Sequence, residues 1–284
     1  MSTTVAHEVP TTTSPTLTVR KPTRGVRGYA KLAGPPIAFL AVIVAIWYLI
    51  SALLGKLSFL LPAPHTIFTE GFFDPRVLSD VVDALWQTLL VSLAGLAVAI
   101  VIGVVWAIAM SQAKSIERTL YPYAVILQCI PILALVPLIG FWFGQEFFAR
   151  MIVSVLIALF PMVSNTLFGL QGVERSQREL FKLQGASRWT VLTKLQLPAA
   201  MPAIFAGMRI SAGLSVVGAI VGDFFFRRGT PGIGSLISNY TARLQGPQLF
   251  AAIIAAALLG VAIFAVFGWI SKLAVGKWYE PAQG

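Results

Sequence analysis

Long apolar stretches without a charged residue run through most of the chain and alternate with short polar segments. Five of them lie at residues 32–55, 84–113, 119–145, 151–173 and 244–271. A helix needs about 20 apolar residues to cross the roughly 30 Å hydrocarbon core of a bilayer, because it rises about 1.5 Å per residue. Each stretch is therefore long enough for a membrane-spanning helix. The sequence lacks the alternating segments of about 10 residues that are typical of a membrane β-barrel.

A sixth apolar segment, at residues 203–226, contains Arg209 and Asp223. These residues would lie about 21 Å apart along a helix, too far to pair within it. We expect them near opposite ends of the span, where long side chains reach the polar headgroups. The pattern thus predicts an all-α integral membrane protein with six transmembrane helices in a domain at 35–275. The expected spans lie at about 35–55, 84–110, 119–143, 150–170, 203–226 and 249–272.

The two ends of the chain differ from this apolar domain. Residues 1–34 are rich in Thr, Pro and Ser and then in Lys and Arg, so we interpret them as a disordered basic tail. Six spans put both termini on one side, and most of the 21 Lys and Arg residues fall on that same side. Basic loops face the cytoplasm. This predicts a cytoplasmic N-terminal tail and a cytoplasmic C-terminal tail at 276–284.

Composition narrows the class of protein. Of the 284 residues, 57% are hydrophobic and only 11% are charged, which excludes a soluble enzyme and a disordered chain. The single cysteine, Cys129, excludes a disulfide-stapled domain. The net charge of +10 is explained by the basic cytoplasmic segments and needs no nucleic acid. The only histidines, His7 and His65, offer no zinc site, and we find no catalytic triad.

Prolines and small residues recur inside the predicted spans. Proline removes a backbone donor and tends to kink a helix, and small residues four positions apart let helices approach closely in lipid. For the small residues, packing within one bundle is the more ordinary interpretation and a dimer face is the alternative. The prolines are Pro131, Pro137 and Pro161, and the small residues are Gly95, Ala99, Gly103, Gly207, Ser211 and Ser215.

Polar and charged residues are concentrated in the segment at 171–202, between the fourth and fifth predicted spans. It predicts a charged helix from Glu174 to Lys182, a break at Gly185, and a second short helix that Ser187 caps. We expect Pro198 to end that second helix. The segment mixes cations with apolar side chains, a surface that suits docking to a soluble partner.

This segment resembles the EAA loop of permease subunits of bacterial binding-protein-dependent ABC importers. The match rests on Glu179, Gly185 and Leu197-Pro198 at the spacing of that loop, with Leu180 and Phe181 where two alanines are usual. The resemblance covers roughly residues 60–275 and is typical of the subfamily for aliphatic sulfonates, taurine, nitrate, and thiamine- or riboflavin-related compounds. It includes LLPAPHTIF at 60–68 and GDFFFRRGTPGIGSLI at 222–237.

The resemblance implies a type I importer permease with a MetI-like bundle in the bacterial inner membrane. Its implied partners are separate ATPase subunits, an extracytoplasmic binding protein and a second permease copy. ATP with Mg²⁺ would be bound by the ATPase, because the Gly-Lys pairs here are followed by Leu57 and Trp278 rather than by the Ser or Thr of a P-loop. The chain itself is expected to be non-catalytic and without cofactor. The implied ATPase-coupling residues are Glu179, Gly185, Ala186, Ser187, Arg188, Leu197 and Pro198.

Three polar residues in the spans are candidates for a translocation path or gate. Gln128 and Asn165 can contact solute or hydrogen-bond across helices, and Asp223 can serve a gate or pair with Arg227 or Arg228. Residues 229–240 form either a re-entrant gate segment or a plain loop. The aromatic-rich GDFFFRRG stretch favours a vitamin-like heteroaromatic solute over taurine or nitrate. An ion-coupled secondary transporter is the alternative function, although we find neither an inverted repeat nor a mid-depth acid.

Overall fold

The computed structural model describes residues 26–57, 59–226 and 228–276, and every regular element in these residues is helical. Its contacts divide the chain into two units, residues 1–49 and 50–284, and helix α1 (Val26–Leu54) crosses the boundary between them. The predicted disordered tail at 1–34 therefore needs a correction at residues 26–34, because the helix already begins at Val26. The first predicted span, at 35–55, stays a prediction. The rest of that tail, and residues 277–284, lie outside the described residues.

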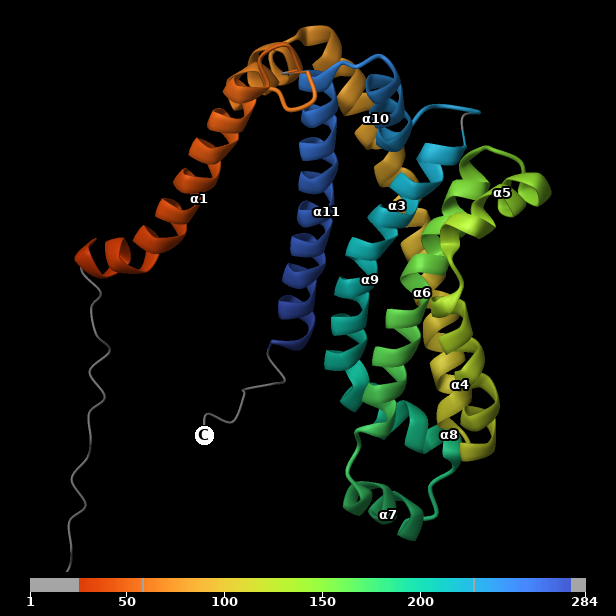
Figure 1. Cartoon of the computed structure of the whole chain (residues 1–284). Coiled ribbons are helices and arrows are strands. Elements are labelled where there is room, and N and C mark those ends of the chain that lie inside the picture. The colour runs from red at the N-terminus through yellow and green to blue at the C-terminus, as the bar shows by residue number, and fades with distance from the viewer. Residues whose placement is uncertain (1–25, 58, 227, 277–284) are drawn as a thin grey trace, which may run out of the picture. The chain divides into compact units, whose positions relative to one another are not determined.

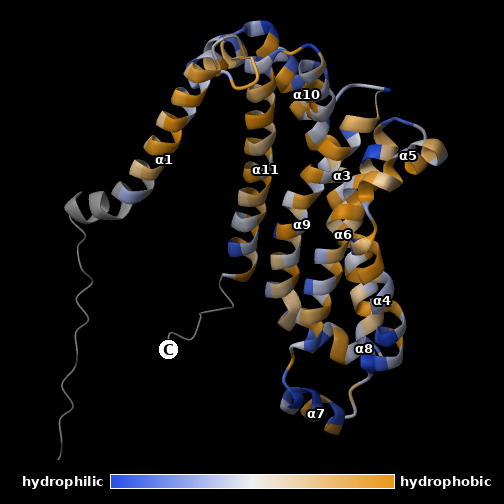
Figure 2. Ribbon diagram, viewed as in Figure 1, coloured by the Kyte–Doolittle hydropathy of each residue, from blue (hydrophilic) through white to orange (hydrophobic). Residues whose placement is uncertain are grey.

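Three long helices form the centre of the second unit. Helix α6 (Phe147–Gln171) packs between α3 (Pro75–Ser111) and α9 (Leu197–Phe225), as Figure 1 shows. Helix α11 (Gly246–Val275) lies against α9 on the other side. Figure 2 shows these helices as largely hydrophobic along their length. The arrangement buries one face of each helix in protein and leaves the remaining apolar surface exposed, as a lipid environment allows.

The small residues singled out in the sequence bring the central helices together. Gly95 of α3 packs against Ser154 of α6, and Ser211 Oγ of α9 donates a hydrogen bond to the Ala158 carbonyl of α6 at 2.7 Å. A Cβ atom added at Gly207 would lie 2.9 Å from the Cβ of Asn165. Packing within one bundle is therefore confirmed for these residues, because each contact lies inside this chain.

The third predicted span is not a single helix. It consists of α4 (Lys114–Cys129) and α5 (Ile132–Phe143), which meet at an angle of 96°. Pro131 stands at the break, where it has no N–H to continue the hydrogen bonding of α4. The predicted kink at Pro131 is confirmed, whereas Pro137 and Pro161 lie within uninterrupted helices.

Short elements close the two ends of the bundle. Helix α10 packs on α3, α9 and α11, so the segment at 229–240 is a helix from Ile233 onward and not a plain loop. The opposite end carries the segment between α6 and α9. The short elements are η1 (Gly55–Leu57), α2 (Pro64–Thr66), η2 (Ile67–Phe72), α7 (Arg175–Leu183), α8 (Arg188–Val191), η3 (Leu192–Gln196) and α10 (Ile233–Ala242).

Four helical segments of the described residues are long and apolar enough to cross a membrane, and the bent pair α4–α5 makes a fifth. The first predicted span corresponds to the apolar part of α1, Ala38–Leu54, which is shorter than these. The fifth predicted span begins earlier than expected, because α8, η3 and α9 form one continuous helical segment, Arg188–Phe225. The helical membrane fold is thus confirmed, and the count of six spans stays a prediction.

Candidate functional site

The segment between α6 and α9 forms a helix, a tight turn and a second helix, as predicted. Gly185 has a φ of +68°, a conformation that residues with a side chain adopt only at a cost. The turn is closed by hydrogen bonds from Gly185 N–H to the Lys182 carbonyl and from Ala186 N–H to the Phe181 carbonyl, each at 3.0 Å. This is the glycine-terminated arrangement in which α7 ends and the chain reverses.

The next helix begins where the sequence predicts. Ser187 is the N-cap of α8, and its Oγ accepts a hydrogen bond from Thr190 N–H at 3.1 Å. Arg188 is the first residue of α8 and is exposed. The cap and the glycine turn together hold α7 and α8 in a defined relation.

The expectation that Pro198 ends the second helix is wrong. Pro198 lies in the first turn of α9, and the helical path from α8 continues through it. The π-helical turn η3 comes directly before it, with Leu197 N–H bonded to the Leu192 carbonyl. Proline lacks an N–H and clashes with the preceding turn of an α-helix, so a wider turn in front of it relieves both problems.

Two side chains fasten the segment to the end of α6. Arg178 Nη2 donates to the carbonyl oxygens of Leu170 and Gln171 at 3.0 and 2.9 Å. Gln196 Nε2, from the other side of the turn, donates to the same Leu170 carbonyl at 3.4 Å. A helix leaves its last four carbonyls without helical donors, and these contacts satisfy two of them. The segment is therefore tied to α6 at both of its ends.

The outer surface of this segment is partly apolar. Leu183 and Trp189 are 87% and 71% exposed, and Leu180 is 54% exposed. Figure 2 shows α7, which carries Leu180 and Leu183, as mostly hydrophilic, and Trp189 lies on α8. Glu179 forms an exposed ion pair of 2.7 Å with Arg175, which contributes little to stability at the surface. We identify the segment from Glu174 to Pro198 as the candidate coupling loop.

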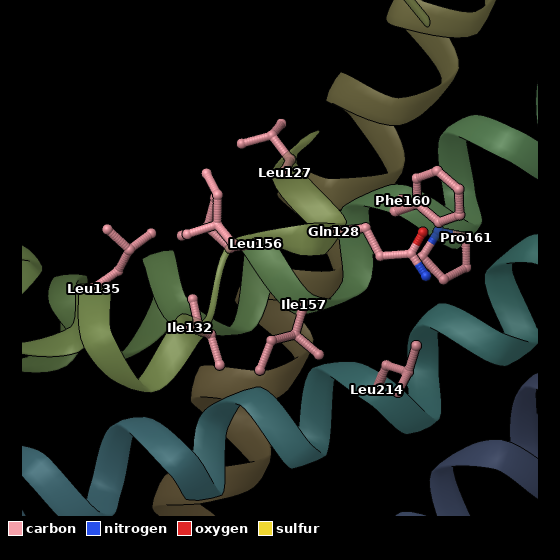
Figure 3. Close-up of a pocket in the computed structure, with 10 residues that line it drawn as sticks. Leu127, Gln128, Ile132, Leu135, Leu156, Ile157, Phe160, Pro161 and Leu214 are labelled. Carbon is pink, nitrogen blue, oxygen red and sulfur yellow. The ribbon is translucent and has the colours of Figure 1, made fainter. Parts of the chain in front are cut away.

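A second candidate site lies where α4 bends into α5. The pocket there has a volume of about 250 Å³, and Gln128 is its only polar side chain. Figure 3 shows the amide of Gln128 beside Pro161. Within the described part of the chain this amide has no hydrogen-bond partner, so the bond across helices considered for it does not form. The pocket is lined by Leu127, Gln128, Ile130, Ile132, Leu135, Leu156, Ile157, Phe160, Pro161 and Leu214.

Asn165 does not line this pocket. Its Nδ2 donates to the Pro161 carbonyl at 2.8 Å, one turn earlier in its own helix. The expectation of a hydrogen bond across helices is therefore also corrected for Asn165. Asn165 is thus linked to the pocket only through Pro161, which lines it.

A buried ion pair joins α6 to α9 at the end of the bundle that carries α10. Arg150 Nη1 lies 3.3 Å from Asp223 Oδ1, and their side chains are only 3% and 0% exposed. Thr88 Oγ1 of α3 donates to Asp223 Oδ2 at 2.8 Å. The expected pairing with Arg228 does not occur, because Asp223 lies on the α9 face that packs against α6. Arg227 lies outside the described residues.

The same cluster holds the connection from α9 to α10. Arg150 donates from Nη2 to the Arg228 carbonyl at 2.6 Å and from Nη1 to the Thr230 carbonyl at 2.8 Å. Ile233 N–H donates to Thr88 Oγ1 at 2.9 Å. Arg150, Asp223 and Thr88 thus hold α6, α9 and α3 together, and we call this cluster the clamp. A gate role for Asp223 stays a prediction.

Sequence reasoning missed Arg150, Thr88, Arg178 and Gln196 as members of these sites. Arg150 stands directly before the apolar run at 151–173. An arginine at such a border is a usable signal, because a charge that becomes buried needs a partner inside the protein.

The fold is that of a helical membrane protein. Residues 99–276 match the family model described as the binding-protein-dependent transport system inner membrane component. The chain belongs to this family, whose members are membrane-spanning subunits of ABC importers.

Similar proteins agree with this assignment. The chain is 32% identical to the formylaminopyrimidine transport permease protein ThiX of Halalkalibacterium halodurans, over 81% of this chain and 90% of that protein. It is 29% identical to the riboflavin transport system permease protein RibX of Chloroflexus aurantiacus, over 93% of this chain and 98% of that protein. Both matches cover nine tenths or more of the relative's own length.

A solved structure supports the fold. The crystal structure of an amino acid ABC transporter with histidines superposes with a TM-score of 0.56 at 17% identity, and the match covers 71% of this chain and 95% of that one. At this identity the likeness concerns the fold alone, and it confirms the predicted MetI-like bundle.

Proposed function

We propose that this chain is the permease subunit of an ATP-driven importer and that its candidate coupling loop contacts a separate ATPase. The observation that carries the proposal is the exposure of Leu183 and Trp189 on a loop whose backbone is fixed by the turn at Gly185. Large apolar side chains held out from a rigid polar loop favour a protein partner over solvent.

The contacts of the loop suggest how motion of the ATPase reaches the membrane. Arg178 and Gln196 connect the loop to the end of α6, and η3 continues directly into α9. A displacement of the loop therefore moves two central helices together. An ATPase that contacts the loop differently in its two nucleotide states would favour one opening of the permease over the other.

The assembly that we propose contains two copies of this chain, two ATPase chains that bind ATP with Mg²⁺, and an external binding protein. One chain contributes a single set of spans. We therefore place the solute path between two copies of the chain. The coupling loop and both termini would then face the cytoplasm, as the distribution of Lys and Arg predicts.

For the solute we propose a small heteroaromatic compound of the vitamin-precursor type. The names of the relatives that match most of this chain, for formylaminopyrimidine and riboflavin, support this class. The sulfonates, taurine and nitrate of the wider subfamily are the alternatives.

The proposal is tested with vesicles that contain the chain, its ATPase and its binding protein. We expect solute uptake that requires ATP, and we expect Gly185→Val to abolish uptake while the protein still inserts, because a β-branched side chain at a φ of +68° deforms the turn. Uptake that survives Gly185→Val removes the coupling role. Uptake driven by an ion gradient without any ATPase supports the alternative, a secondary transporter.

A second test concerns the contact itself. Trp189→Ala should reduce copurification of the ATPase by about tenfold or more, as loss of a central aromatic contact does at other interfaces. Trp142→Ala is the matched control, because Trp142 is 63% exposed on α5, which lies at the opposite end of the bundle from α7 (Figure 1). Equal copurification of both variants would contradict the proposed contact.

A further inference from the structure

We propose that the pocket at the bend between α4 and α5 binds the transported solute, and that it accepts an uncharged planar ring whose edge carries both hydrogen-bond donors and acceptors. This inference rests on the proposed function, since it assigns the solute contact within the same permease. It adds two points: Gln128 is the residue that recognises the solute, and the solute carries no net charge.

The first argument is the chemistry of the walls. Apart from Gln128, the side chains around the pocket are aliphatic or aromatic, and none of them is charged. Such walls favour a flat apolar ring, and a volume of about 250 Å³ lies just below the range of about 300–1,000 Å³ of typical small-molecule sites. The pocket therefore suits a single small ring system or the ring end of a larger solute.

The second argument is the unpaired amide of Gln128. It lines the pocket, is exposed, and has no hydrogen-bond partner among the described residues. A carboxamide offers an acceptor oxygen and two donor hydrogens. It can therefore pair with a ring edge that presents a carbonyl or ring nitrogen next to an N–H group, as pyrimidine-type rings do.

The third argument is the break in the helix. Within residues 126–134, all of which are described, the backbone hydrogen bonds that flank the break run from Ile130 N–H to the Ile126 carbonyl and from Ala134 N–H to the Pro131 carbonyl. The carbonyl of Leu127 would bond to the N–H of residue 131 in a continuous helix, but that residue is proline. Carbonyls at the end of α4 and N–H groups at the start of α5 thus remain for other partners. Leu127 and Ile132, on the two sides of the break, line the pocket together with Gln128.

The carbonyl and N–H groups at the break carry partial charges of opposite sign. Together with the Gln128 amide, they distinguish between classes of solute. An uncharged ring with donors and acceptors finds partners for each polar edge. A sulfonate or nitrate would lose its hydration in an apolar pocket that offers no cation in return, so binding of the anion is unfavourable. The pocket accordingly favours the heterocyclic class and disfavours the anions.

Labelling of a single cysteine provides the experiment. Cys129 is exposed but does not line the pocket, so the thiol is moved into the pocket wall. In Leu156→Cys combined with Cys129→Ser, the thiol replaces a lining side chain, and a bound solute should hinder its reaction with a maleimide. The rate of labelling is measured on the full chain in lipid nanodiscs, with formylaminopyrimidine, riboflavin and ethanesulfonate as probes. We expect at least one of the two heterocycles to slow labelling, and ethanesulfonate to leave it unchanged.

A pair of matched variants separates recognition from simple shielding. Gln128→Leu keeps the size of the side chain and removes its polar atoms, so the heterocycle concentration for half-protection should rise about tenfold, as for the loss of a pair of hydrogen bonds. Gln112→Leu is the control, because Gln112 lies at the turn between α3 and α4 and does not line the pocket. It should leave protection unchanged.

The outcomes distinguish this inference from the proposed function. No slowing by either heterocycle, slowing by ethanesulfonate, or protection that is unaffected by Gln128→Leu would overturn the pocket assignment, even if ATP-dependent uptake is observed. Protection that depends on Gln128, together with vesicles that show no ATP-dependent uptake, would retain the pocket and reject the importer.

Discussion

Arg150 at the start of α6 and Asp223 at the end of α9 form a buried ion pair of 3.3 Å. Because Thr88 of α3 also donates to Asp223, one carboxylate connects all three central helices. Removing one member of a buried pair leaves the other charge without a partner. The clamp therefore determines how these helices meet at the end that carries α10.

We expect Asp223→Asn to lower the free energy of unfolding by about 3–5 kcal/mol. The double variant Arg150→Met with Asp223→Leu should recover part of this loss, since no charge then remains buried. Arg175→Ala, which removes an exposed pair, should change stability by less than about 1 kcal/mol. Thermal unfolding of the solubilised chain measures all three. Equal stability of Asp223→Asn and the unmodified protein would show that the pair does not hold the helices.

The packing of α9 on α6 predicts different effects of one substitution at two glycines. A Cβ atom at Gly218 would lie 2.6 Å from the Cα of Ser154, so Gly218→Ala should destabilise the bundle by about 1–3 kcal/mol. At Gly213 the nearest atom, Cδ2 of Phe264, is 3.8 Å away, and the same change should be neutral or stabilising. The unfolding temperatures of the two variants are compared. A larger loss at Gly213 would contradict the observed packing.

Substitutions at Gly185 are expected to act through backbone strain alone and not through side-chain clashes. Nothing lies within 4 Å of a Cβ atom added there, but the φ of +68° makes a side chain costly. Gly185→Val should therefore open the loop, and cleavage by trypsin after Lys182 should accelerate about tenfold, the effect of a 1–2 kcal/mol penalty. Gly185→Asn is the control, because asparagine tolerates this conformation better. Equal cleavage of the valine variant and the unmodified loop would rule out the strain.

Arg178 is predicted to transmit motion and not only to stabilise the loop. Arg178→Met removes both hydrogen bonds to the end of α6. We expect more ATP to be hydrolysed for each solute imported, since the loop then moves without carrying α6. Arg175→Met, on the exposed side of α7, should leave this ratio unchanged. If Arg178→Met lowers stability but leaves the ratio of ATP hydrolysed to solute imported unchanged, Arg178 has a structural role only.

Several features of the fold could be predicted from neighbouring residues alone. The apolar runs predicted the long helices, Pro131 predicted the bend, and Gly185 with Ser187 predicted the turn and the second short helix. Each of these depends on local properties, namely hydropathy, a missing N–H, backbone freedom and a capping oxygen. The error at Pro198 is instructive, because a wider turn before the proline allows the helix to continue.

The sites that join distant parts of the chain could not be predicted in this way. Arg150 and Asp223 are 73 positions apart, and Gln196 reaches a carbonyl 26 positions earlier. The neutral pocket likewise depends on the 96° bend that brings α4, α5, α6 and α9 around Gln128. Sequence alone determined that this protein is a bundle of membrane helices with a polar loop, since hydropathy and helix breaking act over one or two turns. Only the tertiary structure decided which charges pair and where a solute pocket forms, because these depend on which helix faces pack together.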